Sequence, residues 1–311
     1  MSSGTITIGT RASKLALRQA EYIAAEIEKH HSACHVELRT MTTKGDRILN
    51  APLAKIGGKG LFTKELEQAM RAGEIDLAVH SLKDMPTEVP DGLVIGVITA
   101  RLDSGDAFVS VKYASMEELP SGARVGTSSL RRRAQLLAVR PDLQLLDLRG
   151  NVNTRLAKLD AGAFDAIVLA AAGLKRLGLE ERIRCVLPRS MILPAVGQGA
   201  LAIECRAEDT EILSAIEFLA DADMTAAAVA ERAFLRRVEG GCQIPVGVYA
   251  EVGAGNVLHV DAMIASVDGV RVCRSRCMGA VEQAENLGIS LAEELLDAGG
   301  RDILKEIGIA V

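Results

Sequence analysis

The sequence predicts an α/β protein with two similar lobes that flank a cleft and a smaller C-terminal α+β domain. The order strand, Gly-Thr turn, helix, strand, helix, strand occurs twice, beginning at Thr5 and again at Ala123. After about Asp221 the pattern changes to an Ala-rich helix, a Gly-rich loop and strands. A duplicated β-α-β-α-β unit predicts two lobes of one architecture, and the later change of pattern predicts a separate domain.

The first lobe is expected to be discontinuous. The segment Leu193–Cys205 has the pattern of a strand that returns from the second lobe into the first. We therefore predict the first lobe at residues 1–99 with 200–219, the second lobe at 100–199 and the C-terminal domain at 220–311.

The composition limits the functional classes. Apolar residues make up 49% and charged residues 25% of the 311 positions, as in globular proteins. Aromatic residues are only 3%, Trp is absent and the net charge is −5, which argues against a nucleic-acid partner. We find no signal peptide, no run of 18 apolar residues and no metal-binding cysteine spacing. A cytoplasmic monomer without metal or membrane partner is expected, with its six cysteines reduced.

Apolar periodicity predicts the elements of the first lobe. Thr5–Ile8 alternates as a strand, and the turn Gly9–Ser13 leads into a helix. The apolar face of this helix consists of Ala16, Ala20, Ile23 and Ile27. A second strand covers Val36–Met41, a Gly- and Lys-rich mobile loop covers Leu49–Phe62, and a helix then leads into the strand Leu77–Val79.

The second lobe repeats this order, with strands expected at Ala123–Val125 and Leu143–Leu148. Several positions align between the two copies: Gly9-Thr10 with Gly126-Thr127, Ser13 with Ser129 or its neighbour, Gly73 and Asp76 with Gly162 and Asp165, and Lys83 with a residue near Lys175. In the C-terminal domain we expect a helix at Thr225–Arg236, a hairpin with Asp268-Gly269 at its tip, and a long helix from Ala280.

Polar side chains gather where the strand Leu77–Val79 ends. His80, Ser81, Lys83 and Asp84 follow it directly, and Pro86 stops regular structure soon after. In open α/β sheets the carboxyl ends of the strands face the ligand crevice. An isolated Asp beside a Lys would be read as a solvated turn, so the functional interpretation depends on the rest of the chain.

Arginines follow predicted strand ends in both lobes: Arg11, Arg131, Arg132, Arg149, Arg155 and Arg176. A guanidinium group binds carboxylates and phosphates with two parallel hydrogen bonds. Six such residues in an acidic protein predict an anionic ligand in the cleft, with Asp84 ionised among the cations. Neighbouring helix positions are about 100° apart, so we leave Arg133 on the surface. The turns at Gly9 and Gly126 also favour anions, but neither matches a nucleotide-binding fingerprint.

Cys242 differs from the other cysteines in its surroundings. Most buried cysteines act as small apolar residues, which accounts for Cys34, Cys185 and Cys205. The sequence Gly240-Gly241-Cys242 instead places a thiol on a flexible loop. Either a structural role or a nucleophilic or attachment role is compatible with this position.

Taken together, these motifs resemble the porphobilinogen deaminase (hydroxymethylbilane synthase) family over essentially the whole chain. The matching motifs are GTRASKLAL (Gly9–Leu17), GGKGLFTKELE (Gly57–Glu67), VHSLKDMPT (Val79–Thr87), GTSSLRRRAQL (Gly126–Leu136), RGNVNTRL (Arg149–Leu156), LPAVGQGAL (Leu193–Leu201) and EGGCQIPVG (Glu239–Gly247). So many motifs in the right order make the resemblance specific.

The resemblance implies two lobes arranged like a periplasmic binding protein and a third domain. It also implies a dipyrromethane cofactor, one per chain, held through a thioether at Cys242. Four porphobilinogen molecules would be added to this primer in turn, each with loss of ammonia. Water would then release the linear hydroxymethylbilane.

The resemblance also assigns roles to residues. Asp84 would be catalytic, stabilising the positive azafulvene-like species that follows deamination. The cofactor would be bound by Ser81, Lys83, Asp84, Thr127, Ser129, Arg131, Arg132, Arg149 and Arg155. The substrate and growing chain would be bound by Arg11, Ser13, Gln19, Arg149, Arg155 and Arg176. Lys55 and Lys59 would belong to a mobile active-site flap.

Two alternatives from other classes remain. A non-catalytic two-lobed protein that binds a carboxylate would explain the cleft and the arginines, but not Asp84 among cations or the Gly-Gly-Cys242 loop. A nucleotide-dependent α/β enzyme is opposed by the missing fingerprints.

Overall fold

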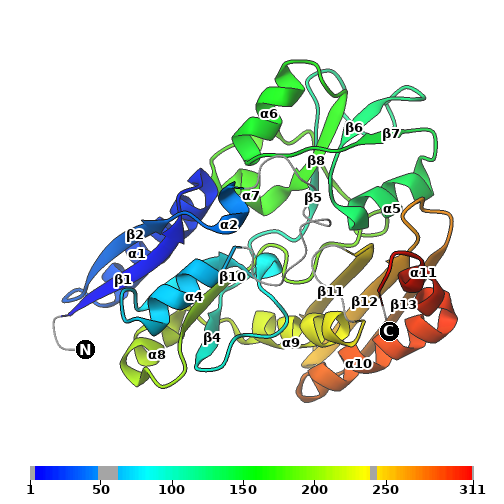
Figure 1. Ribbon diagram of the computed structural model, residues 1–311. Coiled ribbons are helices and arrows are strands. Elements are labelled where there is room, and N and C mark those ends of the chain that lie inside the picture. The colour runs from blue at the N-terminus through cyan, green and yellow to red at the C-terminus, as the bar shows by residue number, and fades with distance from the viewer. Residues whose placement is uncertain (1–3, 48–61, 239–243, 310–311) are drawn as a thin grey trace. The chain divides into compact units, whose positions relative to one another are not determined.

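The computed structural model describes residues 4–47, 62–238 and 244–309 (Figure 1). The chain divides into two compact units, residues 1–101 with 200–225 and residues 102–199 with 226–311. The described residues form three sheets: one five-stranded sheet in the first unit, and one five-stranded and one three-stranded sheet in the second. This confirms the predicted fold class of two similar α/β lobes and a smaller α+β part. The three-domain boundaries stay a prediction.

The first unit holds a sheet in the order β2-β1-β3-β10-β4. β1 is parallel to both its neighbours, and β10 is antiparallel to both of its own. The strands are β1 (Thr5–Arg11), β2 (His35–Met41), β3 (Leu77–Ser81), β4 (Leu93–Ile98) and β10 (Leu201–Arg206). The helices are α1 (Lys14–His30), α2 (Lys44–Arg47), α4 (Lys64–Arg71) and α8 (Thr210–Ile216), with short 3-10 turns η1 (Leu82–Asp84) and η3 (Glu217–Leu219). Because β10 pairs with β3 and β4, the expected return strand is confirmed.

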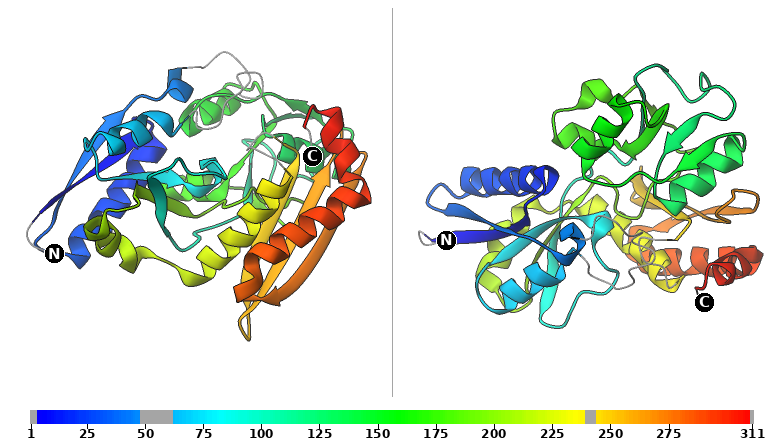
Figure 2. Two further views of the ribbon diagram at one scale, coloured as in Figure 1. Left: turned by 60° about the horizontal axis from the view of Figure 1, so that its bottom comes forward. Right: turned by 45° about the horizontal axis from the view of Figure 1, so that its top comes forward.

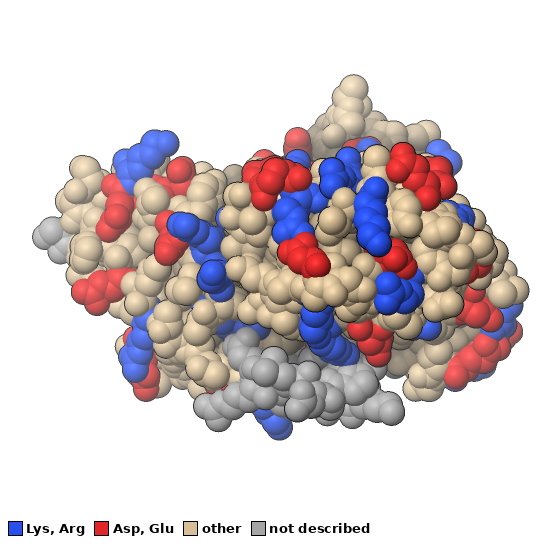
Figure 3. Space-filling view, turned by 90° about the horizontal axis from the view of Figure 1, so that it is seen from above, with Lys and Arg blue, Asp and Glu red and all other residues tan. Residues whose placement is uncertain are grey.

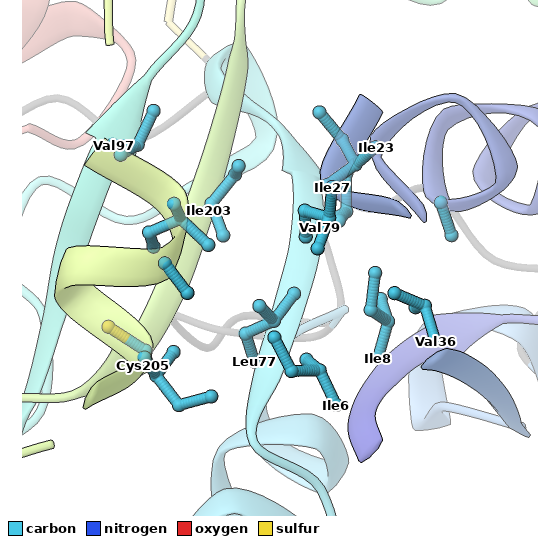
Figure 4. Close-up of a cluster of buried hydrophobic side chains, with 14 of the residues drawn as sticks. Ile6, Ile8, Ile23, Ile27, Val36, Leu77, Val79, Val97, Ile203 and Cys205 are labelled. Atoms are coloured by element: carbon cyan, nitrogen blue, oxygen red, sulfur yellow. The ribbon is translucent and has the colours of Figure 1, made fainter. Parts of the chain in front are cut away.

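Apolar side chains on the two faces of this sheet explain why the helices pack there. The predicted apolar face of α1 is buried, with Ile23 and Ile27 fully removed from solvent. These two side chains meet Ile8 of β1 and Val79 of β3 in one core (Figure 4). Burying each isoleucine contributes about 1.5–3 kcal/mol, so this face fixes α1 on the sheet. A second cluster, which includes Leu66 of α4, lies with Ala78 of β3 on the opposite face.

The second unit contains a sheet in the matching order β7-β6-β8-β5-β9. Again the first three strands are mutually parallel, and β5 is antiparallel to both neighbours. The strands are β5 (Asp106–Val109), β6 (Arg124–Gly126), β7 (Gln144–Leu146), β8 (Ala166–Ala170) and β9 (Cys185–Leu187). The helices are α5 (Leu130–Val139), α6 (Val152–Asp160) and α7 (Ala171–Arg176), with the 3-10 turn η2 (Glu180–Arg182).

Hydrogen bonds repeat between the two sheets and confirm the duplicated pattern. The backbone N–H of Thr7 donates to Asp76 Oδ2 at 2.8 Å. In the second sheet, the N–H of Arg124 donates to Asp165 Oδ2, also at 2.8 Å. Gly73 and Gly162, which follow α4 and α6, have φ angles of +70° and +76°. Only glycine adopts such angles without strain, which explains its presence at both helix ends.

The predicted match between Lys83 and a residue near Lys175 is wrong. Lys83 lies 83 − 76 = 7 residues after Asp76, so its counterpart lies 7 residues after Asp165, at Ala172. The backbone supports this register, since the N–H of Leu82 donates to Ala200 O and the N–H of Ala171 donates to Gly105 O. The Lys-Asp pair after β3 is therefore not repeated after β8.

The third sheet is antiparallel in the order β11-β12-β13. Its strands are β11 (Val246–Gly253), β12 (Val257–Ala265) and β13 (Val272–Ala280), and the hairpin turn at Asp268-Gly269 is confirmed. The remaining helices are α9 (Ala222–Arg237), α10 (Ala284–Leu295) and α11 (Arg301–Glu306), with short turns η4 (Val281–Gln283) and η5 (Leu296–Gly300). α10 packs along β12 and β13 (Figure 2). Among the helices described, none is both long and apolar enough to cross a bilayer.

Candidate functional site

The end of β1 carries the first of the expected site residues. Arg11 is the last residue of the strand, and its guanidinium carbon lies 4.2 Å from the centre of the Phe62 ring. Ser13 begins α1, because its Oγ accepts a hydrogen bond from the N–H of Ala16 at 3.3 Å. Gln19, one turn further, is buried and donates to Ser81 Oγ at 2.8 Å. This bond joins α1, the helix that follows β1, to the end of β3.

Asp84 is exposed on a turn whose neighbours are buried. It ends the 3-10 turn η1, which follows β3 directly. Leu82 and Met85, on either side of the Lys-Asp pair, are 1% and 3% exposed. The N–H of Leu82 donates to Ala200 O, and the N–H of Met85 donates back to Leu82 O. The buried side chains and backbone hydrogen bonds of Leu82 and Met85 therefore fix the turn. The Asp84 carboxylate is accessible, and Lys83 is half-buried.

A cluster of buried ionisable side chains lies on the α4 face of this sheet. His80 Nε2 lies 3.1 Å from Glu204 Oε2, and both side chains are buried. Glu67 of α4 is also buried, and its pKa is raised by burial and, to a lesser degree, by the charge of Glu204. His80 was expected beside Ser81 and Asp84. Because side chains alternate along a strand, it points instead to the opposite face from Ser81.

The second unit presents a turn of the same kind at the end of β6. Thr127 is buried, and its Oγ1 accepts a hydrogen bond from the N–H of Ser129 at 3.3 Å. Ser129 in turn begins α5, because its Oγ accepts from the N–H of Arg132. Ser13 and Ser129 therefore have the same capping role in the two units.

Arg131 and Arg132 are both buried and share one carboxylate, that of Asp106. Arg131 Nη1 donates to Asp106 Oδ2 at 2.6 Å, and Arg132 Nη2 donates to Asp106 Oδ1 at 2.6 Å. Burial alone would raise the pKa of the Asp106 carboxyl, but the two guanidinium groups outweigh this and hold that pKa far below its usual range. Asp106 is absent from the residues predicted from the sequence. Arg133 is only half-buried.

The other expected arginines of this unit contact glycine carbonyls. Arg155 Nε donates to Gly150 O at 2.8 Å, where Gly150 has a φ angle of +111°. Arg176 Nη2 donates to Gly199 O at 2.7 Å. Arg149 precedes Gly150, and all three arginines are half-buried. The head groups of Arg155 and Arg176 are therefore held by these carbonyls, and all three half-buried side chains are partly accessible to an anionic ligand.

Three expected residues lie outside the described residues: Lys55, Lys59 and Cys242. The other five cysteines are free thiols. Cys34 and Cys205 are buried as expected, and burial raises the pKa of the Cys205 thiol to about 11. Cys185 is half-buried, so the prediction of full burial is wrong for it.

Chemically, the described residues of the first unit offer an accessible carboxylate at Asp84 and the guanidinium group of Arg11, and those of the second unit offer the paired guanidinium groups of Arg131 and Arg132. Such donors suit a ligand with several carboxylates and a positive centre. The chain as a whole is not basic, since its net charge is −5, and on the face seen in Figure 3 acidic and basic side chains of the described residues are mixed. An overall positive field is therefore not available to attract anions, and any anion site on this chain has to be formed by particular arginines.

Comparison with known proteins gives consistent matches. Residues 6–214 match the family model "Porphobilinogen deaminase, dipyromethane cofactor binding domain", and residues 225–297 match "Porphobilinogen deaminase, C-terminal domain". The chain is 53% identical over 302 residues to the porphobilinogen deaminase of Pelobacter propionicus, which covers 97% of each chain.

Solved binding proteins are more distant. The methionine binding protein MetQ has 17% identity and a TM-score of 0.43, over 68% of this chain and 87% of that chain. A nutrient binding protein from Burkholderia cenocepacia bound to methionine has 14% identity and a TM-score of 0.42, over 68% of this chain and 90% of that chain.

Proposed function

The chain belongs to the porphobilinogen deaminase family, and on that premise we propose how its own residues carry out the reaction. The protein is a transferase of porphyrin biosynthesis. It condenses four porphobilinogen molecules head to tail on a dipyrromethane primer, with loss of ammonia at each step, and releases linear hydroxymethylbilane by hydrolysis.

The donors of the second unit fit the dipyrromethane cofactor. A dipyrromethane made from porphobilinogen carries acetate and propionate groups, so its site needs cationic and hydroxyl donors. Arg131 and Arg132 supply guanidinium groups, and Thr127 and Ser129 supply hydroxyls beside them. When bound, the cofactor supplies the free pyrrole carbon to which the first substrate is joined. Its proposed remaining contacts are with Ser81, Lys83, Asp84, Arg149 and Arg155, and its proposed attachment is through the thiol of Cys242.

Asp84 is the proposed catalytic residue, and its placement carries the proposal. An exposed carboxylate on a turn fixed by Leu82 and Met85 is available to a ligand but does not move far. Such a carboxylate accepts hydrogen bonds from pyrrole N–H groups. It also stabilises the positive charge that develops on the substrate's pyrrole ring as ammonia leaves. Preorganised stabilisation of this kind contributes about 3–4 kcal/mol when a single hydrogen-bonding group provides it.

The half-buried arginines are proposed to bind the carboxylates of the substrate and the growing chain. They are Arg11, Arg149, Arg155 and Arg176, with Ser13 and Gln19 as polar partners. The contact between Gln19 and Ser81 supports this grouping, because it links α1, which follows Arg11 and begins at Ser13, to the end of β3. Lys55 and Lys59 are proposed to belong to a flap that covers the reacting groups.

We also propose that the protein works as a monomer in the cytoplasm. The five described cysteines are free thiols, as expected for a reducing compartment. Sedimentation equilibrium over a wide concentration range checks the monomer, and a concentration-dependent mass would contradict it.

The cofactor assignment is tested by intact mass. Wild type should carry an excess equal to one linked dipyrrole, Cys242→Ser should carry none, and the control Cys185→Ser should carry the same excess as wild type. Protein purified without the cofactor should gain this mass after incubation with porphobilinogen. If wild type stays unmodified after that incubation, the chain is a carboxylate-binding protein and not a deaminase.

Asp84→Glu separates catalysis from cofactor binding. The variant keeps the charge but moves the carboxylate by one methylene, so it should retain the cofactor mass and lose at least about a hundredfold in kcat. Asp91→Glu, on the exposed loop that follows, serves as the control and should turn over normally. Normal turnover of Asp84→Glu would remove Asp84 from the mechanism.

A further inference from the structure

Asp106 is the centre of a buried polar network in the second unit. The side chain is 1% exposed, at the first position of β5. Its Oδ2 accepts from Arg131 Nη1 at 2.6 Å. Its Oδ1 accepts from Arg132 Nε at 2.9 Å, from Arg132 Nη2 at 2.6 Å and from Arg131 Nη2 at 3.3 Å. A further donor to Oδ1 is Gln198 Nε2, at 3.0 Å.

The network holds two neighbouring helix residues in one place. Arg131 and Arg132 are consecutive on α5, where side chains normally diverge by about 100°. Both nevertheless converge on Asp106, and each has a second partner in the backbone. Arg131 Nη1 also donates to Leu193 O at 2.6 Å, and Arg132 Nη1 donates to Val168 O at 3.0 Å. Each guanidinium group is therefore fixed from two directions.

The charges in this network do not cancel. Two guanidinium cations and one carboxylate leave one net positive charge, with Arg131 4% and Arg132 6% exposed. Burial and the neighbouring Arg132 lower the pKa of Arg131, and Asp106 opposes them. A buried site with one uncompensated positive charge is costly unless an anion completes it.

We propose that Asp106 is a positioning residue for cofactor binding: it preorganises Arg131 and Arg132 and leaves the charge that one carboxylate of the dipyrromethane completes. This inference rests on the proposed roles of the two arginines. Asp106 itself touches neither substrate nor cofactor in this scheme. A buried ion cluster with a role in folding alone is the competing explanation.

The first experiment uses wild-type protein free of cofactor. If the arginines are preorganised, their side-chain Nε–H groups should exchange with solvent at least about a hundredfold more slowly than those of exposed arginines, as measured by NMR. Signals are assigned with Arg131→Lys and Arg132→Lys. Exchange as fast as at the surface would overturn the proposal without the need for any Asp106 variant.

The second experiment follows cofactor loading in Asp106→Glu and Asp106→Asn. Apoprotein of each is incubated with porphobilinogen, and the gain in intact mass is timed for the folded fraction, which is measured by circular dichroism. The control is Asp142→Glu, which keeps its charge beside Arg140 on the surface. We expect loading about ten- to hundredfold slower in the Asp106 variants and unchanged in the control, because displaced guanidinium groups no longer match the carboxylate.

Two readouts separate positioning from folding. In the loaded fraction of Asp106→Glu, KM for porphobilinogen should equal that of wild type, because Arg131 and Arg132 serve the cofactor and not the incoming substrate. If the folded Asp106 variants load at the wild-type rate, the network serves folding alone and the proposal is overturned. If wild type itself acquires no mass, the proposed function fails instead, so the two failures are distinguishable.

Discussion

Glu231 offers a test of how the third sheet is held to the rest of the second unit. This residue of α9 is fully buried, and its carboxylate accepts two backbone hydrogen bonds. The N–H of Gly197 donates to Oε2 at 2.6 Å, and the N–H of Ala250 in β11 donates to Oε1 at 2.8 Å. One side chain thus bridges the segment before β10 and strand β11.

In Glu231→Gln, one of these two bonds is lost. The amide keeps one oxygen acceptor but replaces the other with an NH₂ group, which faces a backbone N–H and cannot accept from it. A hydrogen bond to a charged group contributes about 1.5–3 kcal/mol, and a buried unsatisfied N–H costs about 1–3 kcal/mol. Since these effects overlap, we expect the free energy of unfolding to fall by about 2–4 kcal/mol.

The assay is urea unfolding followed by circular dichroism. The matched control is Asp223→Asn, the same change of carboxylate to amide at an exposed position of the same helix. Its effect should stay within about 0.5 kcal/mol. If Glu231→Gln is as stable as this control, the two hydrogen bonds to the Glu231 carboxylate contribute nothing measurable to the free energy of unfolding, and this explanation is refuted.

Two further predictions concern the first unit's buried acid and the substrate's carboxylates. Burial raises the pKa of Glu67, so the folded protein favours the protonated carboxyl group. The resulting stabilisation is fully present below the usual glutamate pKa range and is lost as the pH rises through the raised pKa. The Tm of Glu67→Gln should therefore rise relative to that of wild type as the pH increases above the usual glutamate range, and a difference independent of pH would contradict this. Arg149→Leu should raise KM for porphobilinogen about tenfold or more, because a paired guanidinium group is lost. Added salt should not restore the KM of wild type. If Arg149→Leu has the kinetics of wild type, the substrate's carboxylates bind elsewhere.

Local sequence signals predicted most of the two lobes. The helix beginning at Ser13 and the buried stripe of α1 follow from capping and from apolar spacing, both of which act over a few residues. The repeat could be predicted because glycines occur at the same places in both copies. Gly73 and Gly162 are examples, since each follows a helix and has a positive φ angle. The return of residues 201–206 to the first sheet was also predictable, because the segment has a strand pattern where the second lobe should end.

Contacts between distant residues were not predictable in the same way. Asp106 lies 25 residues before Arg131, and Glu204 lies 124 residues after His80. Neither acid belongs to one of the motifs, and a single buried carboxylate has no periodic signal. The predicted match of Lys83 near Lys175 failed for a related reason: it followed residue type instead of strand register, which only sheet pairing determines.

The corrected register shows how the duplicated frame has diverged. Both units retain a serine-capped helix after the first strand, which favours anions in each. After the third strand they differ: the first unit has the short turn with Asp84, and the second has α7, with Ala172 and Gly173 at the matching positions. On the proposed assignment, the reacting carboxylate therefore belongs to one copy alone. The second copy instead has Asp106 at the start of β5, paired with Arg131 and Arg132 of α5, where the first copy has Leu201. On the proposed assignments, the first copy therefore supplies the reacting carboxylate, and the second supplies a fixed positive charge for the primer.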